Sequence, residues 1–332
     1  MAKASIAPEP IESDEQNPAR RLRLRAAWMY FVEEMTQNEI ALKLGVGRVT
    51  VVRLLAAARE RNEVKISIGD RLAECVEAER LLEKRFGVGE VIVVPLSSRG
   101  ADATGPVSAA TGAYVSSLVR PNLRIGVGWG RTLVSSLAFM NERTVDDVSV
   151  VSLLGGIMKA RKFNPAEFAW RFASLYQADC YLMTAPLVVD SAATREALIE
   201  RCGLGDIFEL AKSLDAVVLS AAGTGPDATS HQSKFISNAD RASVIKAGAV
   251  GDVLFNFFDA NGELVDHPIN ERVMSVPLDI IKKVPVRVLA AGGASKVQAL
   301  AGALKLLKPT VLITDEYTAK DVLKLAGPDG IA

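Results

Sequence analysis

One segment of the chain combines glycines with a cation and a hydroxyl in a way that suits a small anion. Residues 126–132 read Gly-Val-Gly-Trp-Gly-Arg-Thr, follow an apolar run and precede a helical pattern. Glycines leave backbone amides bare, and such amides at the start of a helix can cradle a phosphate or a polyol. The hydroxyl of the threonine would add a donor. The candidate contacts here are Gly128, Trp129, Gly130, Arg131 and Thr132.

Three more glycine turns follow strand-like runs later in the chain. They are Gly155-Gly156, Gly223-Thr224-Gly225 and Gly292-Gly293, and the last leads to Lys296 at the expected start of a helix. A single such turn can serve close packing alone. A set of turns after parallel strands favours a shared ligand site. Neither a P-loop lysine pattern nor the full GxGxxG spacing with its acidic partner is present, so we expect no cofactor and a ligand that is small and anionic or rich in hydroxyls.

Other charged side chains near these turns could bind the hydroxyl groups of such a ligand. They are Asp252, Asp259, Arg272 and Asp315. Asp315 directly follows a strand-like run, which is where ligands collect in parallel sheets. Asp259 starts the sequence Asp-Ala-Asn-Gly, which is equally typical of an ordinary hairpin turn, so both interpretations stay open.

These residues are carried by a region in which strand-like and helical runs alternate. The alternation predicts an α/β domain with a doubly wound, mostly parallel sheet covered on both faces, whose ligands bind at the carboxyl ends of the strands. The expected strands are 91–95, 123–127, 148–154, 180–183, 216–220, 286–291 and 311–314. The expected helices include 132–140, 165–176, 194–201 and 296–306.

A different pattern, two short helices joined by a tight turn, precedes this domain. Thr36 can cap the first helix, Glu39 can complete a capping box, and Gly45 suits the left-handed residue that ends it. The second helix is expected from about Arg48 to Arg61, and an amphipathic helix that starts near Arg20 precedes the pair. This arrangement is typical of a helix-turn-helix DNA reader.

The start of that second helix carries side chains that suit base edges and phosphates. Arginine can donate to guanine or phosphate, threonine to either, and valine can contact a thymine methyl group. From Arg20 to Lys65 there are ten cations and five anions, although the whole chain has 39 of each. A small basic region in a chain of zero net charge is typical of a DNA-binding domain. The alternative interpretation is a small helical bundle whose cations are only solvated. The candidate DNA contacts are Thr36, Gln37, Gly47, Arg48, Val49, Thr50 and Arg53.

The composition argues against several other classes of protein. Three cysteines and two histidines are scattered, which predicts neither a disulfide framework nor a metal site, and no apolar run is long enough to span a membrane. The start has no secretory signal pattern, so we place the protein in the cytoplasm. We expect a disordered tail (1–17), a helix-turn-helix domain (18–68), a helical connector (69–88) and an effector-binding domain (89–332).

Taken together, these motifs resemble the SorC family of bacterial sugar-responsive transcriptional regulators, sometimes grouped with deoxyribonucleoside-type regulators. The likeness runs from about Arg20 to the end of the chain. It rests chiefly on Thr-Gln-Asn-Glu-Ile-Ala at 36–41, Val-Val-Arg-Leu-Leu at 51–55, Gly-Trp-Gly-Arg-Thr at 128–132, Gly-Asp at 251–252, Gly-Gly-Ala-Ser-Lys at 292–296 and Leu-Ile-Thr-Asp-Glu-Tyr-Thr-Ala at 312–319.

The resemblance implies a DNA-binding head and an effector domain similar to sugar-phosphate isomerases, assembled as dimers or tetramers. It also implies that residues 129–132 and Lys296 hold a phosphate, with 223–225, Asp252, Asp259 and Arg272 around the remainder of the effector. Two positions depart from the family pattern. Gly47 stands where relatives usually carry serine, which weakens the N-cap by a few tenths of a kcal/mol, and Val52 replaces a usual polar residue.

We therefore expect a regulator that binds a double-stranded DNA operator of a carbohydrate or polyol catabolic operon. A small phosphorylated sugar or sugar alcohol would control that binding. Two alternatives have different consequences. A sugar-phosphate isomerase-like enzyme would use Asp252 or Asp259 as its general base, and an assembly protein would use the glycine turns for packing only.

Overall fold

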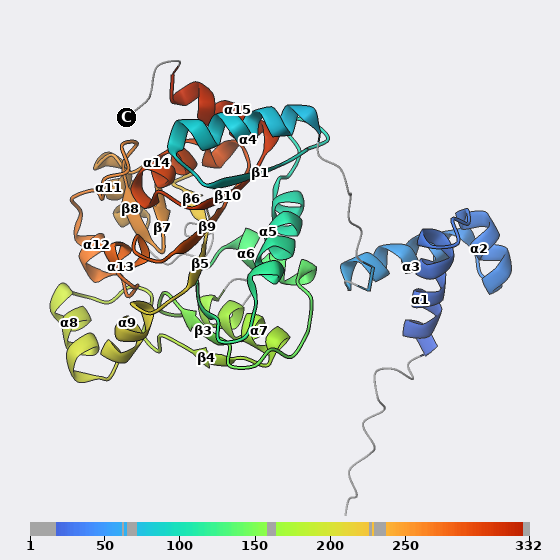
Figure 1. Ribbon diagram of the computed structural model, residues 1–332, viewed down its shortest axis with the longest axis horizontal. Coiled ribbons are helices and arrows are strands. Elements are labelled where there is room, and N and C mark those ends of the chain that lie inside the picture. Colours follow the sequence, from blue (N-terminus) through green and yellow to red (C-terminus); the bar gives the residue numbers. More distant parts are fainter. Residues whose placement is uncertain are drawn as a thin grey trace, which may run out of the picture. The chain divides into compact units, whose positions relative to one another are not determined.

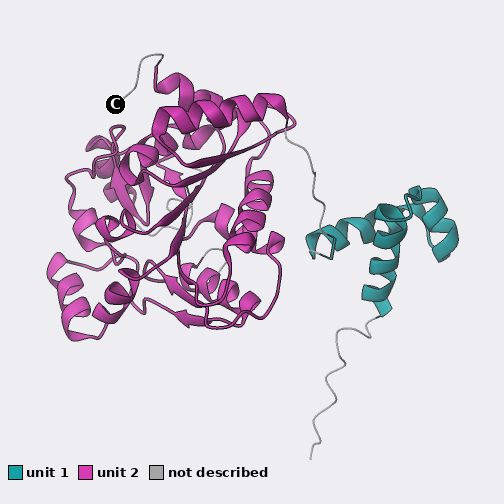
Figure 2. Cartoon of the chain, viewed as in Figure 1, with its two compact units in different colours: residues 1–69 teal, residues 70–332 magenta. Residues whose placement is uncertain are grey.

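The protein divides into two compact units, which Figure 2 shows in different colours. The computed structural model describes residues 18–61, 63–64, 72–157, 164–225, 228 and 237–327. Unit 1 lies within residues 1–69, and unit 2 lies within residues 70–332. The tail expected at 1–17 lies outside the described residues. Among the helices in the described ranges, none is long and apolar enough to cross a membrane.

Unit 1 consists of three helices around a small core (Figure 1). The helices are α1 Pro18–Phe31, α2 Gln37–Leu44 and α3 Arg48–Glu60. The core comprises Ala26, Ala27, Ile40, Ala41, Val51, Leu55 and Ala58. The three helical runs that the sequence predicts before residue 62 are therefore present.

Both ends of α2 carry the caps that the sequence predicts. The Thr36 hydroxyl accepts a hydrogen bond from the Glu39 amide at 3.4 Å, and the Glu39 carboxylate accepts one from the Thr36 amide at 2.8 Å. Gly45 ends the helix with a φ of 65°, in the left-handed region that favours glycine. These caps satisfy several of the backbone groups that the ends of an eight-residue helix would otherwise leave unpaired.

Unit 2 is built on a seven-stranded sheet (Figure 1) in which every neighbouring pair is parallel. The strand order is β1-β10-β9-β5-β2-β3-β4. The strands are β1 Glu90–Val94, β2 Arg124–Val127, β3 Ser149–Ser152, β4 Asp179–Tyr181, β5 Ala216–Leu219, β9 Val286–Ala290 and β10 Val311–Asp315. All of them fall on runs that the sequence predicts as strands, which confirms the α/β fold class.

Helices cover both faces of this sheet. One core takes in α5 Thr104–Leu118, α6 Arg131–Ser136 and α7 Pro165–Tyr176. The other takes in α4 Ala73–Phe86, α9 Gly205–Ala211, α14 Val297–Leu307 and α15 Glu316–Leu325. Successive side chains of a strand point to opposite faces, so Ile313 of β10 belongs to the first core and Leu312 to the second. The expected doubly wound arrangement is confirmed.

A small antiparallel sheet, which the sequence does not predict, follows β5. Its strands are β6 Ala221–Gly223, β7 Gly251–Val253 and β8 Asn256–Phe258, in that order. The sheet packs on α14 so closely that a Cβ at Gly251 would lie 2.4 Å from the Cβ of Ala299. The remaining described elements are α8 Ala192–Arg201, α11 Asn238–Lys246, α12 Pro268–Arg272, α13 Leu278–Ile281 and the 3-10 turns η2 Leu137–Phe139 and η3 Ala294–Lys296.

The helix expected as a connector, α4, packs within unit 2. Two of its glutamates, one helical turn apart, reach the outer edge of β1. The amide of Val93 donates to Glu79 at 2.9 Å, and that of Val91 donates to Glu83 at 3.2 Å. Because β1 is the end strand of the sheet, these amides have no strand partner. Helix α4 supplies the acceptors instead.

Candidate functional site

The four glycine turns lie next to one another at one edge of the large sheet. Its strands are parallel, so their carboxyl ends share that edge. Along it the consecutive strands β3, β2, β5 and β9 lead to 155–156, 128–132, 223–225 and 292–293 respectively, and β10 with Asp315 comes next. The four turns that the sequence analysis places after parallel strands therefore follow strands that are neighbours in the sheet.

The chain leaves β2 and β5 toward opposite faces of the sheet. After β2, helix α6 joins the core that contains α5 and α7, whereas after β5 the small sheet joins the other core. The two strands are direct neighbours. A reversal of this kind between adjacent strands is where open α/β sheets bind their ligands.

Some of the candidate glycines are required by packing alone. A Cβ at Gly155 would lie 2.6 Å from the carbonyl oxygen of Ala185, and one at Gly223 would lie 2.6 Å from that of Ser295. Gly292 is confined by side chains instead, since a Cβ there would lie 2.6 Å from the Asp315 carboxylate and 2.9 Å from the Val107 side chain. For these three positions the plain turn interpretation accounts for the glycine.

Other candidate glycines have open space beside them. At each of these the nearest described heavy atom to a Cβ would be 3.6 Å away or farther, so packing does not require glycine there. They are Gly130, Gly156, Gly225 and Gly293. At Gly130 and Gly293 the φ angles of 136° and 102° favour glycine by themselves. In the first turn, Gly128 as well as the side chains of Trp129 and Thr132 are buried, which leaves Gly130 and Arg131 as its accessible part. Thr132 is 1 % exposed, and its role as a donor to a ligand stays a prediction.

Two cations approach each other at this edge. Lys296 is half-buried at the start of α14, and burial, followed by the positive charge of Arg131, lowers its pKa to about 8. Asp102 and Asp315 oppose the shift with their negative charges. A partly desolvated ammonium beside a guanidinium gains free energy from an added anion. The site thus combines two cations with two carboxylates, and the Lys296 ammonium is disfavoured by burial and by Arg131.

Asp102 belongs to this cluster although the sequence analysis does not single it out. Its carboxylate accepts from the Thr104 amide at 2.9 Å at the start of α5. Hydrogen bonds from the Thr104 backbone and side chain, and then the charges of Arg131 and Lys296, lower its pKa. The available signal was the Asp-Ala-Thr sequence before a helix, which indicates a cap and not a site.

Asp315 is fully occupied by the protein itself. One carboxylate oxygen accepts from the amides of Tyr317 and Thr318, and the other accepts from the amide of Gly293 at 2.8 Å and the Thr318 hydroxyl at 2.6 Å. The residue is 1 % exposed. The expectation that Asp315 grips a ligand hydroxyl is corrected: it caps α15 and holds the turn that leads to Lys296.

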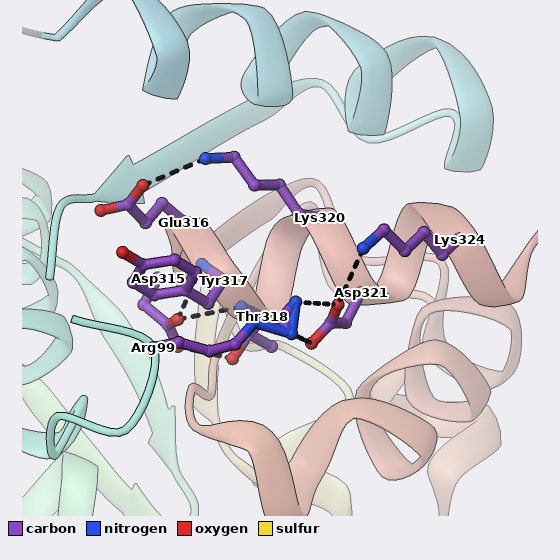
Figure 3. Close-up of polar contacts among 8 residues, drawn as sticks. All are labelled: Arg99, Asp315, Glu316, Tyr317, Thr318, Lys320, Asp321 and Lys324. Atoms are coloured by element: carbon purple, nitrogen blue, oxygen red, sulfur yellow. Dashed lines mark hydrogen bonds and ion pairs between the residues drawn. The ribbon is translucent and has the colours of Figure 1, made fainter.

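The loop after β1, which carries Asp102, is tied to α15 (Figure 3). The Arg99 guanidinium pairs with the Asp321 carboxylate at 2.6 Å and lies 5.8 Å above the Tyr317 ring. Glu316 accepts from the Leu96 amide at 3.0 Å. These contacts fix the loop relative to the strand end that positions Lys296.

Asp252 is a buried carboxylate with one oxygen that has no partner among the described residues. Its other oxygen accepts from the Phe255 amide at 3.2 Å, and burial raises its pKa to about 7. The tip of the β7–β8 hairpin, Leu254-Phe255, has φ angles of 50° and 64°, which is unusual for bulky residues. Leu254 reaches the first glycine turn, where a Cβ at Gly128 would lie 3.2 Å from it. A buried unpaired oxygen at such a place suits a ligand hydroxyl.

Asp259 does not join this cluster. Its carboxylate accepts from the amides of Asn261 and Glu263, both at 2.9 Å, and so closes its own turn. The turn lies against Gly302 in the later part of α14, several residues beyond Lys296. The hairpin-turn interpretation is therefore the one that fits, and the expectation of an effector contact at Asp259 is corrected.

Arg272 lies near the carboxyl end of β3, beside the glycine turn at 155–156. It ends α12, and the segment that follows it hydrogen-bonds to the second glycine turn, where the Gly155 amide donates to the Met274 carbonyl at 2.8 Å. The Arg272 Nε is buried without a partner among the described residues. On the opposite side of the switch point, Arg241 donates from Nε to the Thr224 carbonyl at 3.2 Å and anchors the third turn. No pattern in the sequence around Arg241 indicates this contact.

In unit 1 the candidate DNA contacts gather at the exposed start of α3. Arg48, Val49, Thr50 and Arg53 are all exposed, and Gly47 caps the helix without a side-chain hydrogen bond. Arg48 Nε donates to the Gln37 side chain at 3.4 Å. A cavity of about 590 Å³ beside them is lined by Tyr30, Glu34, Met35, Thr36, Gln37, Asn38 and Arg48. The arginines are free of the core and available to a partner.

No three histidine, cysteine, aspartate or glutamate side chains come together as a metal site would require, within the part of the chain that the structure describes. His267, one of the two histidines, caps α12: its Nδ1 accepts from the Ile269 amide at 3.2 Å. His231 lies outside the described residues. The described site consists of the cations Lys296 and Arg131, the glycine turns and the carboxylates of Asp102, Asp252 and Asp315.

A parallel sheet with an anion-compatible edge, joined to a separate three-helix unit, defines a class of ligand-binding regulators, and comparison with known proteins agrees. The family model described as "Putative sugar-binding domain" matches residues 70–324, so the chain belongs to that family. The match begins at the boundary between the two units.

Individual relatives extend the similarity to both units. The chain is 30% identical over 308 residues to the erythritol catabolism regulatory protein EryD of Brucella abortus (strain 2308), covering 91% of this chain and 96% of the relative. It is 29% identical over 303 residues to the deoxyribonucleoside regulator of Bacillus subtilis (strain 168), covering 91% and 96%. The full-length sorbitol operon regulator SorC from Klebsiella pneumoniae has the same fold, with a TM-score of 0.69, 25% identity and coverage of 91% and 98%. These confirm the SorC-family resemblance, and these relatives are regulators, not enzymes.

Proposed function

We propose that the protein is a DNA-binding transcriptional regulator of a carbohydrate or polyol catabolic operon. A small phosphorylated sugar or sugar alcohol, bound at the glycine-turn edge of unit 2, would control its binding to operator DNA in the cytoplasm. The observation that carries this proposal is the meeting of Lys296 and Arg131 with open glycine turns at the switch point of the sheet.

The two cations support the phosphate. Both are accessible in part, and the ammonium is held where its charge is unfavourable. A phosphate placed between them would offset the repulsion and accept a hydrogen bond from a turn amide such as that of Gly130. The Gly293 amide already donates to Asp315 and Thr318. An uncharged polyol would relieve none of that repulsion.

Asp252 supports hydroxyl recognition in the same ligand. Its partly unsatisfied carboxyl group can accept from one hydroxyl and, when protonated, donate to another. Arg272, whose Nε is also unsatisfied among the described residues, can donate from the β3 end of the edge. An effector with a charged end and a hydroxylated body matches this distribution of groups.

The exposed start of α3 supports DNA recognition. Arg48, Thr50 and Arg53 can reach base edges or phosphates as in a helix-turn-helix reader, with Thr36 and Gln37 at the start of α2 placed to contact the backbone. The relatives named above regulate erythritol catabolism, deoxyribonucleosides and a sorbitol operon. We infer the same general class of effector and target for this chain, assembled as a homo-oligomer.

Thermal unfolding of the full chain with matched ligands tests the effector class. Erythritol phosphate, pentose phosphates and the corresponding unphosphorylated polyols would be compared, because a ligand that binds only the folded state raises the unfolding temperature. We expect stabilisation by one or more phosphorylated compounds and none by their unphosphorylated counterparts at equal concentration. Stabilisation by inorganic phosphate as strong as by any sugar phosphate would contradict hydroxyl recognition.

DNA binding is tested separately with the DNA upstream of the gene's own operon. Footprinting should reveal a protected site, and a stabilising effector should change the protection. If the protein protects no DNA in either state, the regulatory proposal fails even if a sugar phosphate binds.

A further inference from the structure

Helix α1 carries a stripe of large apolar side chains that the core of unit 1 does not cover. Leu24, Trp28 and Val32 are 36 %, 60 % and 56 % exposed. On the same helix Arg23, Ala26 and Ala27 are buried, so α1 already has its inward face. An exposed tryptophan between two exposed aliphatic residues on so small a unit is typical of an interaction surface.

The three side chains form one continuous line. They are spaced by four residues, which places them on the same side of a helix. Val32 continues the last turn of α1, since its amide donates to the Trp28 carbonyl at 2.9 Å. Trp28 is therefore the midpoint of the line, with one aliphatic residue a turn before it and one a turn after it.

The charges beside the stripe differ between its two ends. Arg21 and Arg25 are exposed near the Leu24 end, and Glu33 and Glu34 are exposed beyond the Val32 end. Two copies of α1 packed antiparallel about a two-fold axis at Trp28 would bring the arginines of each copy toward the glutamates of the other. A parallel pair would place like charges together. The surface is thus complementary to itself in one orientation only.

We propose that the stripe Leu24-Trp28-Val32 is a contact between two copies of this chain, formed by antiparallel packing of their α1 helices across a two-fold axis. Trp28 meets its own counterpart, and Leu24 of each copy meets the partner's Val32. The stripe shares no residue with the candidate DNA contacts, so both α3 helices of such a pair stay available for two half-sites related by the same axis.

The contact is expected to be weak by itself. Three side chains cover much less than the roughly 800 Å² per partner of a standard protein interface. Pairing of the heads would then depend on their local concentration, which rises when other contacts or DNA hold two chains together. A covalent trap is a better probe of such a contact than a dissociation constant.

Cysteine cross-linking of the full chain tests the proposal. In a background carrying Cys180→Ser and Cys202→Ser, with the buried Cys75 kept, Trp28→Cys should form a disulfide-linked dimer under mild oxidation, because facing residues at a two-fold axis bring their Cα atoms within reach of a disulfide. The matched control is Leu42→Cys on α2, a residue 84 % exposed and outside the stripe. It should remain largely monomeric on a non-reducing gel. Equal dimer yields from the two variants would overturn the proposal.

A second pair of variants tests the orientation and guards against local disruption at position 28. Leu24→Cys alone should give little dimer, whereas Leu24→Cys combined with Val32→Cys should give much more. If Leu24→Cys alone cross-links as well as the double variant, the helices are not antiparallel and the proposed packing is wrong. Neither experiment needs DNA or an effector, so their failure would leave the proposed regulatory function untouched.

Discussion

The two units place their candidate functional side chains in opposite environments. In unit 1 the side chains of Arg48, Val49 and Arg53 are exposed on a helix whose other side forms the core. In unit 2 Lys296 is half-buried and Asp252 is buried, and both have shifted pKa values. Substitution of the exposed α3 side chains should not change the stability of the fold. Substitution of Lys296 or Asp252 should change ligand affinity, stability and the dependence of both on pH. The two units should therefore respond differently to equivalent substitutions.

Loss of both arginines at the start of α3 should have the largest effect. The double variant Arg48→Ala, Arg53→Ala should bind operator at least about 30-fold more weakly, since each specific arginine contact contributes roughly 1–3 kcal/mol. Effector-induced stabilisation should be unchanged. Electrophoretic mobility shift and thermal unfolding measure the two properties. Arg61→Ala, which removes one charge at the far end of the same helix, is the control and should weaken binding far less.

Removal of the Lys296 ammonium should weaken effector binding and leave the protein folded. Lys296→Met should weaken effector binding by about 10- to 100-fold, because a hydrogen bond to a charged group contributes roughly 1.5–3 kcal/mol. DNA binding without effector should persist. Lys305→Met, at the other end of α14, is the matched control for calorimetric titration. Equal affinities in the two variants would remove Lys296 from the site.

The pH dependence of effector binding should follow the protonation of Lys296. Its folded-state pKa of about 8 lies below its ordinary value of 10.5, so the unfolded chain binds the proton more tightly. The contribution of this group to stability should therefore rise as the pH rises from about 8 to 10.5. Affinity for a phosphorylated effector should fall over the same interval as the ammonium loses its charge. Lys296→Met should show neither trend.

Asp252 should give the opposite dependence of stability on pH. Its pKa is raised from 3.8 to about 7 by burial, so the folded protein retains a proton that the unfolded chain loses, and stability should decrease as the pH rises through that interval. Asp252→Asn should unfold at a temperature a few degrees above the unsubstituted chain at pH 8, with the difference disappearing near pH 4. Thermal unfolding across that range measures it. An identical pH profile for both proteins would show that Asp252 is ionised without penalty.

The smallest expected effect is at the cap of α2. Thr36→Ala should lower the stability of unit 1 by about 1 kcal/mol, the usual contribution of an N-cap hydroxyl. Thr36→Ser, which keeps the acceptor, is the control. Chemical denaturation followed by circular dichroism reports the change. No difference between the two variants would mean that the capping box contributes nothing here.

Much of the fold follows from the sequence because its signals are strong and local. The large sheet consists of apolar runs bounded by turns, and α2 has a complete capping box at Thr36 and Glu39. The small sheet was missed since its three-residue strands are too short to show a period. Helix α4 looked like a linker because an amphipathic pattern does not say against which unit its apolar face packs.

The site was less predictable than the fold because residue type does not reveal which hydrogen bonds a side chain already makes. Asp315 and Asp259 both looked like ligand contacts, yet each is occupied by amides of its own turn. Asp102 joins the site from the loop after β1 and Arg241 from helix α11, and no local pattern signals either contact. Lys296 was identifiable since it follows a glycine pair at a strand end.

The two glutamates of α4 also have a consequence for solubility. An uncovered end strand offers its amides as a template for strand addition from another molecule, which is a common start of aggregation. Glu79 and Glu83 occupy those amides on β1 and put negative charge along the rim. Oligomers of this protein should therefore not grow by extending the sheet at β1, and replacing both glutamates by alanine would leave the amides of Val91 and Val93 without these acceptors.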